Sequence, residues 1–113
     1  MTEERLPTEL WVTAHMRQCM AKGLSVTVAR KGEAMGGTVM VKIVLGRVEG
    51  CKLLSQSRDE NGQLGWLAAF EGEIVAEAKA DEYIARSTKR DPDLWVIEVE
   101  DKTGANPFEG KIF

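Results

Sequence analysis

Apolar residues recur along the chain with two spacings, one typical of helices and one typical of strands. Helical spacing covers residues 8–22 and 76–89, and alternation covers residues 24–30, 38–45, 51–58, 63–70 and 94–100. Segments rich in glycine, or containing proline, separate most of these stretches. The pattern therefore predicts the element order α-β-β-β-β-α-β, followed by a tail over residues 102–113.

The first helix is expected to begin at Thr8, whose side chain can cap it, with Glu9 in the first turn, where the helix dipole favours an anion. It is expected to end at Gly23, because glycine readily adopts the left-handed conformation that closes a helix. One face carries an apolar stripe with His15 at its border, and the stripe consists of Val12, Met16, Cys19 and Met20. That face is predicted to point into the core.

Asn61 and Gly62 lie between two alternating segments, which indicates a tight β-hairpin with a type I′ turn. With these two residues as the loop, Glu60 is opposite Gln63 and Ser57 is opposite Trp66. That register predicts one apolar face, made of Cys51, Leu53, Trp66, Ala68 and Phe70.

The segment from Asp91 to Asp101 is expected to close the core. Pro92 ends the second helix, because the residue before a proline is pushed out of the helical region of backbone conformation. The strand that follows alternates between a core face and a face expected to be solvated, namely Trp95, Ile97 and Val99 against Glu98 and Glu100.

Strand 38–45 is expected to be central in the sheet, because its second face still carries Met40 and Val44 beside Lys42. Strands joined by short turns favour antiparallel pairing, and the helices stand at either end of that run. The sequence therefore predicts an α+β fold. It would form a single domain over residues 1–113, with a mostly antiparallel sheet and both helices on one face.

Several stretches carry a resemblance to a known family. They are Arg5 to Val12 (RLPTELWV), Tyr83 to Arg86 (YIAR) and Asp91 to Asp101 (DPDLWVIEVED), and Gly37 to Val41 (GTVMV) also fits. In these residues the chain resembles the small bacterial proteins grouped as domain of unknown function 1491. The similarity implies one domain over nearly the whole chain, and it implies no activity and no catalytic residues.

The composition is that of a folded globular chain, with 43% hydrophobic and 29% charged residues. No apolar run approaches the roughly 20 residues that span a bilayer, so no contact with a membrane is expected. The first residues are acidic, unlike those of a signal peptide, and a cytoplasmic location is expected. In that compartment Cys19 and Cys51 are expected to be buried, reduced thiols.

The net charge of −3 is unevenly distributed, with +2 over residues 1–70 and −6 over residues 71–101. An acidic excess argues against nucleic-acid binding, which would have to use a patch formed by Arg30, Lys31, Lys42, Arg47, Lys52 and Arg58. The opposed charges also allow the acidic segment of one copy to meet the basic hairpins of a second copy.

His15 is the only histidine, and with Cys19 one turn later it forms a weak candidate pair for a metal. Two protein ligands are fewer than the three that a zinc site needs. Nothing in the sequence places Cys51 near His15 as a nucleophile and base. The sequence therefore predicts no metal, no cofactor and no catalytic residues.

Two function classes are preferred, and nucleic-acid binding by the basic hairpins stays a third alternative. The first is a non-catalytic binding domain whose partner is another protein or a second copy, with Trp11 beside the helical stripe as a candidate anchor. The second is a small-ligand protein or enzyme that uses the acids around the last strand. The candidate interaction or family-signature residues are Trp11, Asp91, Pro92, Asp93, Trp95, Glu98 and Glu100.

Overall fold

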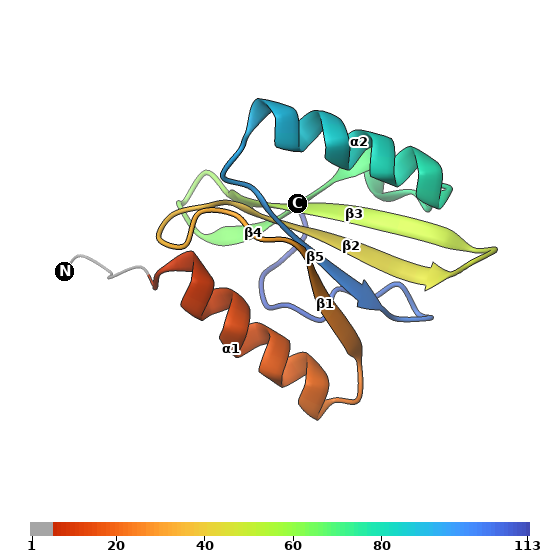
Figure 1. Ribbon diagram of the computed structural model, residues 1–113, viewed down its shortest axis with the longest axis horizontal. Helices are drawn as coiled ribbons and strands as arrows, with labels where there is room; N and C mark the ends of the chain where they lie inside the picture. The colour runs from red at the N-terminus through yellow and green to blue at the C-terminus, as the bar shows by residue number, and fades with distance from the viewer. Residues whose placement is uncertain (1–5) are drawn as a thin grey trace.

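A computed structural model describes residues 6–113 and contains a five-stranded sheet with two helices (Figure 1). The elements are α1 (Thr8–Ala21), β1 (Ser25–Arg30), β2 (Val39–Gly46), β3 (Gly50–Arg58), β4 (Leu64–Ala68), the 3-10 turn η1 (Ala69–Gly72), α2 (Glu77–Arg90) and β5 (Trp95–Glu100). Neither helix in the described part of the chain is long and apolar enough to cross a membrane. The predicted element order and the α+β class are confirmed.

The strands lie in the order β1-β5-β2-β3-β4. Every neighbouring pair is antiparallel except β2 and β5, which run parallel with Val41 opposite Ile97. This pair is parallel because α2 carries the chain back over the sheet before β5 inserts beside β2. The prediction of a mostly antiparallel sheet with a central strand at residues 38–45 is confirmed.

The helices cover opposite faces of the sheet, so the prediction that both lie on one face is wrong (Figure 1). Val12 and Cys19 of α1 belong to the same core cluster as Val41 and Ile97. On the other face, Tyr83 and Ile84 of α2 contact the group formed by Met40, Leu94 and Val96. The second face of β2 and β5 still carries apolar side chains, including Met40 and Val96, so each face needs its own cover.

The β3–β4 hairpin has a three-residue loop and not the predicted two-residue type I′ turn. The Asp59 amide donates to the Gln63 carbonyl at 2.9 Å, which closes the loop around Glu60, Asn61 and Gly62. Gly62 has a φ of +77°, whereas Asn61 is not among the described residues with positive φ. Only one position of this loop needs the left-handed conformation, and glycine occupies it.

That longer loop shifts the strand register by one residue. Trp66 lies opposite Gln56 and not opposite Ser57. A shift of one residue reverses which face each side chain occupies. The predicted common face is therefore wrong: Trp66 packs with Leu54 in the core that α1 covers, while Cys51 and Leu53 belong to the core that α2 covers.

β4 ends at Ala68, two residues before its predicted end. Phe70 and Glu71 adopt φ values of 53° and 56°, which turn the chain out of the sheet. The Phe70 ring then meets the Tyr83 ring edge-on, with centroids 5.2 Å apart. This turn transfers the chain from the edge of the sheet to α2.

α1 begins at Thr8 and is closed by Gly23 as predicted, but its N-terminal cap is different. The Thr8 hydroxyl donates to the Gly37 carbonyl at 2.8 Å instead of capping its own helix. The loop before β2 satisfies the helix end, because the Glu9 amide donates to the Ala34 carbonyl at 2.8 Å. Gly23 has a φ of +80°, the conformation expected of a closing glycine.

The buried face of α1 consists of Val12, His15 and Cys19. It differs from the predicted stripe because His15 is inside it and Met20 is 55% exposed. The reason lies at the other end of the chain, where Phe108 and Glu109 contact the His15 side of the helix.

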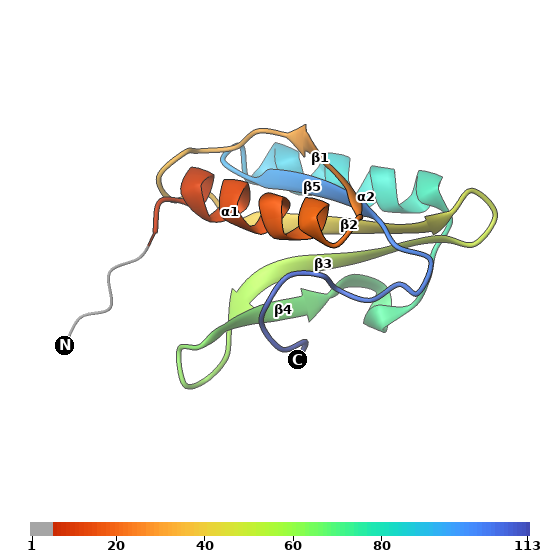
Figure 2. The same cartoon turned by 90° about the horizontal axis from the view of Figure 1, so that it is seen from below.

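The tail is ordered along the outer edge of β4 (Figure 2). The Trp66 amide donates to the Lys111 carbonyl at 2.8 Å, and the Trp66 indole donates to the Glu109 carbonyl at 2.9 Å. Phe108 is buried against the rings of Trp11 and Trp66. The tail therefore completes the core and covers a strand edge that would otherwise lack a partner.

Candidate binding cleft

The family-signature segment from Asp91 to Trp95 connects α2 to β5 and contacts the loop before β2. The Trp95 indole donates to the Glu33 carbonyl at 2.8 Å, and the Trp95 side chain is buried. Arg30 donates from Nη1 to the carbonyls of Leu94, at 2.6 Å, and Pro92, at 3.0 Å. The contacts of this segment therefore hold the loop before β2 against the start of β5.

Asp91 and Asp93 lie in the same connection between α2 and β5. The Asp91 carboxylate accepts the Asp93 amide at 3.1 Å, which turns the chain between α2 and β5. The Asp93 carbonyl accepts the Glu33 amide at 3.0 Å. These two acids thus contribute to chain geometry, and they do not converge with Glu98.

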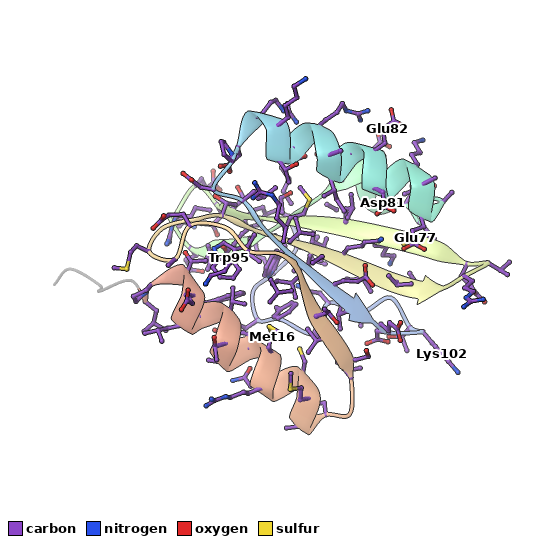
Figure 3. All side chains as sticks on the ribbon, viewed as in Figure 1. Met16, Glu77, Asp81, Glu82, Trp95 and Lys102 are labelled. Carbon is purple, nitrogen blue, oxygen red and sulfur yellow. The ribbon has the colours of Figure 1, made fainter. Side chains whose placement is uncertain are left out.

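Glu98 belongs to an ion cluster beneath α2, which corrects the expectation that it simply faces water. Lys42 of β2 is only 4% exposed. Its ammonium lies 2.7 Å from Glu77, 2.8 Å from Asp81 and 3.4 Å from Glu98. Figure 3 shows Glu77 and Asp81 directed from α2 towards the sheet, whereas Glu82 points away. Glu100 is exposed, as predicted.

The ion cluster holds Lys42 in its charged form. Burial alone lowers the pKa of Lys42, but the hydrogen bonds to Asp81 and Glu77 and the charge of Glu98 outweigh burial and raise this pKa above its ordinary value. A permanently protonated amine is not a nucleophile or a base. Three acids of the late segment thus share one ammonium within the molecule.

His15 is hydrogen bonded through both ring nitrogens. Nδ1 lies 2.8 Å from the Trp11 carbonyl, and Nε2 lies 3.2 Å from a Glu109 carboxylate oxygen. Both ring nitrogens thus face groups of the protein itself, one on its own helix and one on the tail. Among residues 6–113, no group of three or more His, Cys, Asp or Glu side chains is placed to hold a metal ion. His15 connects α1 to the tail.

The two cysteines lie on opposite faces of the sheet, Cys19 in the core under α1 and Cys51 in the core under α2. Both are free and buried, and burial raises the pKa of each thiol.

In the folded protein we expect both thiols to react with a disulfide reagent at least about a hundredfold more slowly than in denaturant, because the thiolate is disfavoured and inaccessible. Stopped-flow thiol titration with and without guanidinium measures this ratio. One thiol reacting at its denatured rate under native conditions would contradict the buried placement.

A cleft of about 950 Å³ opens where α1 begins, between the loop before β2 and the β3–β4 hairpin. Figure 2 shows these segments together at the end of the molecule from which α1 starts. The apolar lining side chains are Leu6, Trp11, Met35 and Leu64, and the polar ones include Gln56, Ser57, Arg58 and Gln63. Three segments distant in sequence thus form one concave surface.

Trp11 forms a fixed wall of this cleft. One side of its indole stacks on the His15 ring, with centroids 3.9 Å apart and planes at 22°. The Phe108 ring lies 5.9 Å from it. Trp11 is partly buried and lines the cleft. The rings of His15 and Phe108 fix the position of its indole.

Sequence reasoning identified Trp11 and named Arg58 only within a possible basic patch, and it missed Met35 and Leu64. Met35 is 68% exposed in a glycine-rich loop, and Leu64 begins an edge strand. An apolar side chain at an exposed turn or edge position can indicate a binding surface, and this was the available signal. Only the fold shows that these side chains lie together.

Comparison with known proteins places these observations in a family. The family model described as protein of unknown function (DUF1491) matches residues 6–109. A crystal structure of a DUF1491 family protein from Caulobacter crescentus CB15 is 34% identical, with a TM-score of 0.86, and the match covers 96% of this chain and 100% of that chain. An NMR structure of a DUF1491 family protein from the same organism is 33% identical, with a TM-score of 0.83 and coverage of 98% and 99%.

The solution structure of protein Atu0922 from A. tumefaciens has the same fold, with 24% identity, a TM-score of 0.71 and 87% coverage of both chains. A search among curated proteins finds no match. The resemblance seen in the signature segments is thus confirmed over almost the whole chain. The chain belongs to the DUF1491 family of proteins of unknown function.

Proposed function

We propose that this protein is a non-catalytic binding domain and that a segment of another protein docks in the cleft between α1, the loop before β2 and the β3–β4 hairpin. The observation that carries this proposal is the make-up of that cleft. Exposed apolar side chains line it together with polar side chains that have few hydrogen-bond partners of their own.

The size and the lining suit an extended peptide. About 950 Å³ is within the usual range of ligand sites, from roughly 300 to 1,000 Å³. In the described part of the chain, no hydrogen bond engages the side chains of Gln56, Ser57 or Gln63. Those groups are available to the amides and carbonyls of a bound backbone, while Leu6, Met35 and Leu64 are available to its apolar side chains.

The fixed indole of Trp11 supports the same proposal. Tryptophan is among the side chains that most often dominate binding energy at protein interfaces. Because its stacking on His15 holds the ring in place, little side-chain freedom is lost when a partner covers its other side.

The state of the reactive side chains supports the non-catalytic part of the proposal. Lys42 is held as a cation by three carboxylates, and both nitrogens of His15 face acceptors. The thiols of Cys19 and Cys51 are buried, and their pKa values are raised. None of these groups lines the cleft.

Peptides selected for binding from a random displayed library are expected to bind the wild type and to lose at least about tenfold in affinity with Met35→Asp or Leu64→Asp. Each change places a charge where an apolar side chain would be covered. Titration of synthetic copies by fluorescence anisotropy measures the affinity.

The matched control is Val48→Asp on the β2–β3 hairpin, where Val48 is 95% exposed and lies outside the cleft. It also introduces one acid at an apolar surface position. A library that yields no binder would contradict the proposal, and so would binders that Val48→Asp weakens as much as Leu64→Asp does.

A further inference from the structure

Building on the proposed function, we propose that the docked segment carries an aspartate or glutamate between apolar residues, and that Arg58 binds that carboxylate. The cleft then recognises one acidic side chain in an extended stretch of another protein. Its apolar border contacts the residues on either side of the acid.

Arg58 is the one charged side chain among the residues that line the cleft, all of which lie in the described part of the chain. It lies at the end of β3 and is exposed. Its Nη1 donates to the Gly62 carbonyl at 2.7 Å, which orients the guanidinium across the hairpin. A guanidinium has five donor hydrogens, so this bond leaves most of them free for a ligand.

No carboxylate of residues 6–113 lies within 4.0 Å of the Arg58 guanidinium. The nearest acids in sequence do not occupy the cleft. Asp59 accepts the amides of Asn61 and Gln63, at 2.9 Å each, and is thereby held inside the hairpin loop. Glu60 does not line the cleft. Within residues 6–113, Arg58 thus presents a positive charge without a carboxylate partner, next to apolar side chains.

One positive charge fits one carboxylate better than it fits a nucleic acid. A phosphate backbone requires several cations along its path, whereas this cleft provides a single one on a chain of net charge −3. A carboxylate can accept two parallel hydrogen bonds from one guanidinium, and that geometry needs no second cation.

The carboxylate is assigned to a side chain and not to the end of a peptide chain. Sites that bind a chain terminus usually offer several free backbone amides. Here five of the lining amides already donate within the protein, namely those of Met35, Gly37, Asn61, Gly62 and Gln63. The start of α1 is also engaged, because its first amides donate to the carbonyls of Met35 and Ala34. With these amides engaged, the anion is assigned to Arg58, the charged side chain of the lining.

The test uses synthetic copies of library-selected binders and variants of the full chain. We expect the selected peptides to contain Asp or Glu flanked by apolar residues. Replacing that acid by Asn or Gln should weaken binding at least about tenfold, and so should Arg58→Gln. With both changes together the loss should be little greater than with either one, because both remove the same contact. Arg47→Gln, which removes an exposed arginine outside the cleft, is the control.

A charge swap separates recognition from a structural effect on the hairpin. Arg58→Glu is expected to reject the acidic peptide and to bind a copy with Lys at the acidic position, which loss of folding could not produce. Peptides with an amidated C-terminus should bind as well as those with a free one, and loss of binding on amidation would assign the anion to the chain end and overturn the inference.

The two proposals fail separately. Peptides that respond to Leu64→Asp but not to Arg58→Gln would leave the binding cleft in place and overturn its preference for an acid. If no peptide binds, both proposals fall.

Discussion

Gly37→Ala is expected to lower the free energy of unfolding by about 3 kcal/mol, whereas Gly36→Ala is expected to change it by less than about 0.5 kcal/mol. The two glycines are neighbours in the loop before β2, and neither has a positive φ, so alanine suits both backbones. The difference arises from their surroundings. A Cβ on Gly36 meets nothing within 4 Å.

A Cβ on Gly37 would collide with the Asp93 carbonyl oxygen, and it would lie 2.9 Å from Cδ1 of Trp95. Neither neighbour can move cheaply. The Asp93 carbonyl accepts the Glu33 amide, and the Trp95 indole is buried and donates to the Glu33 carbonyl. Relieving the collision would therefore separate the loop from the start of β5 and break the hydrogen bonds that join them.

Urea denaturation followed by tryptophan fluorescence measures both variants on one scale. A Gly37→Ala protein as stable as Gly36→Ala would show that the signature segment and this loop are not in close contact. Gly32 provides an independent repeat, because a Cβ there would meet the same carbonyl and would lie 2.6 Å from Cδ1 of Trp95.

The contact of the loop before β2 with Asp93 and Trp95 explains what the signature segment does in the fold. The family resemblance rested on Asp91 to Asp101 and on Gly37 to Val41, which are far apart in sequence. In the structure they are adjacent, because β2 and β5 pair in parallel and Trp95 lies opposite Val39. Two of the four stretches that carry the family resemblance therefore meet in the parallel pair of β2 and β5.

Features set by neighbouring residues could be predicted from the sequence. Gly23 closes α1, and Trp95, Ile97 and Val99 share a core face, because a helix end and strand alternation depend on local geometry. The hairpin at Asn61 and Gly62 was also recognised. Its register was not, because loops of two and three residues both accept glycine in this sequence and differ by one position.

Features set by distant residues could not be predicted. Which face each helix covers depends on how β5 inserts into the sheet, and alternation within a strand does not specify it. Glu98 was expected to be solvated because its partner, Lys42, is 56 positions away. The cleft combines three separate segments, and its side chains look like ordinary surface residues until the fold brings them together. Trp11 was recognised because large aromatic residues are informative by type alone.

The ion cluster beneath α2 leads to the second large effect. Replacing Glu77 and Asp81 together by Gln and Asn is expected to cost about 3 kcal/mol of stability, whereas Lys42→Met is expected to cost about 1 kcal/mol or less. Both changes remove the contacts of Lys42 with Glu77 and Asp81, but the groups left behind differ in burial. Lys42 has a side chain that is 5% exposed, while Glu77 and Asp81 are 50% and 56% exposed.

Removing the acids leaves a buried ammonium with only Glu98, at 3.4 Å, to compensate it. That charge cannot reach water without moving α2. Removing the ammonium instead leaves carboxylates that can turn outwards and be hydrated, and a methionine fills much of the space of the lysine stem. The position of the charge, and not the number of ion pairs, decides the larger effect.

Glu82→Gln is the matched control, because Glu82 lies on the same helix, points to solvent in Figure 3 and pairs only with the exposed Arg86. It is expected to change stability by less than about 0.5 kcal/mol. Chemical denaturation of the four proteins at neutral pH measures the series. Equal losses in Lys42→Met and in the double acid variant would contradict the argument from burial.

Alkaline titration gives a second, independent readout of the same cluster. The pKa of Lys42 is raised in the folded protein, so its contribution to stability is fully present below the unfolded value of about 10.4 and is lost as the pH rises through the folded value. The wild type should therefore lose stability above about pH 10 more steeply than Lys42→Met does. Parallel curves in this range would mean that Lys42 is not bound more tightly as a cation in the folded state, and the cluster would then stabilise the protein by packing alone.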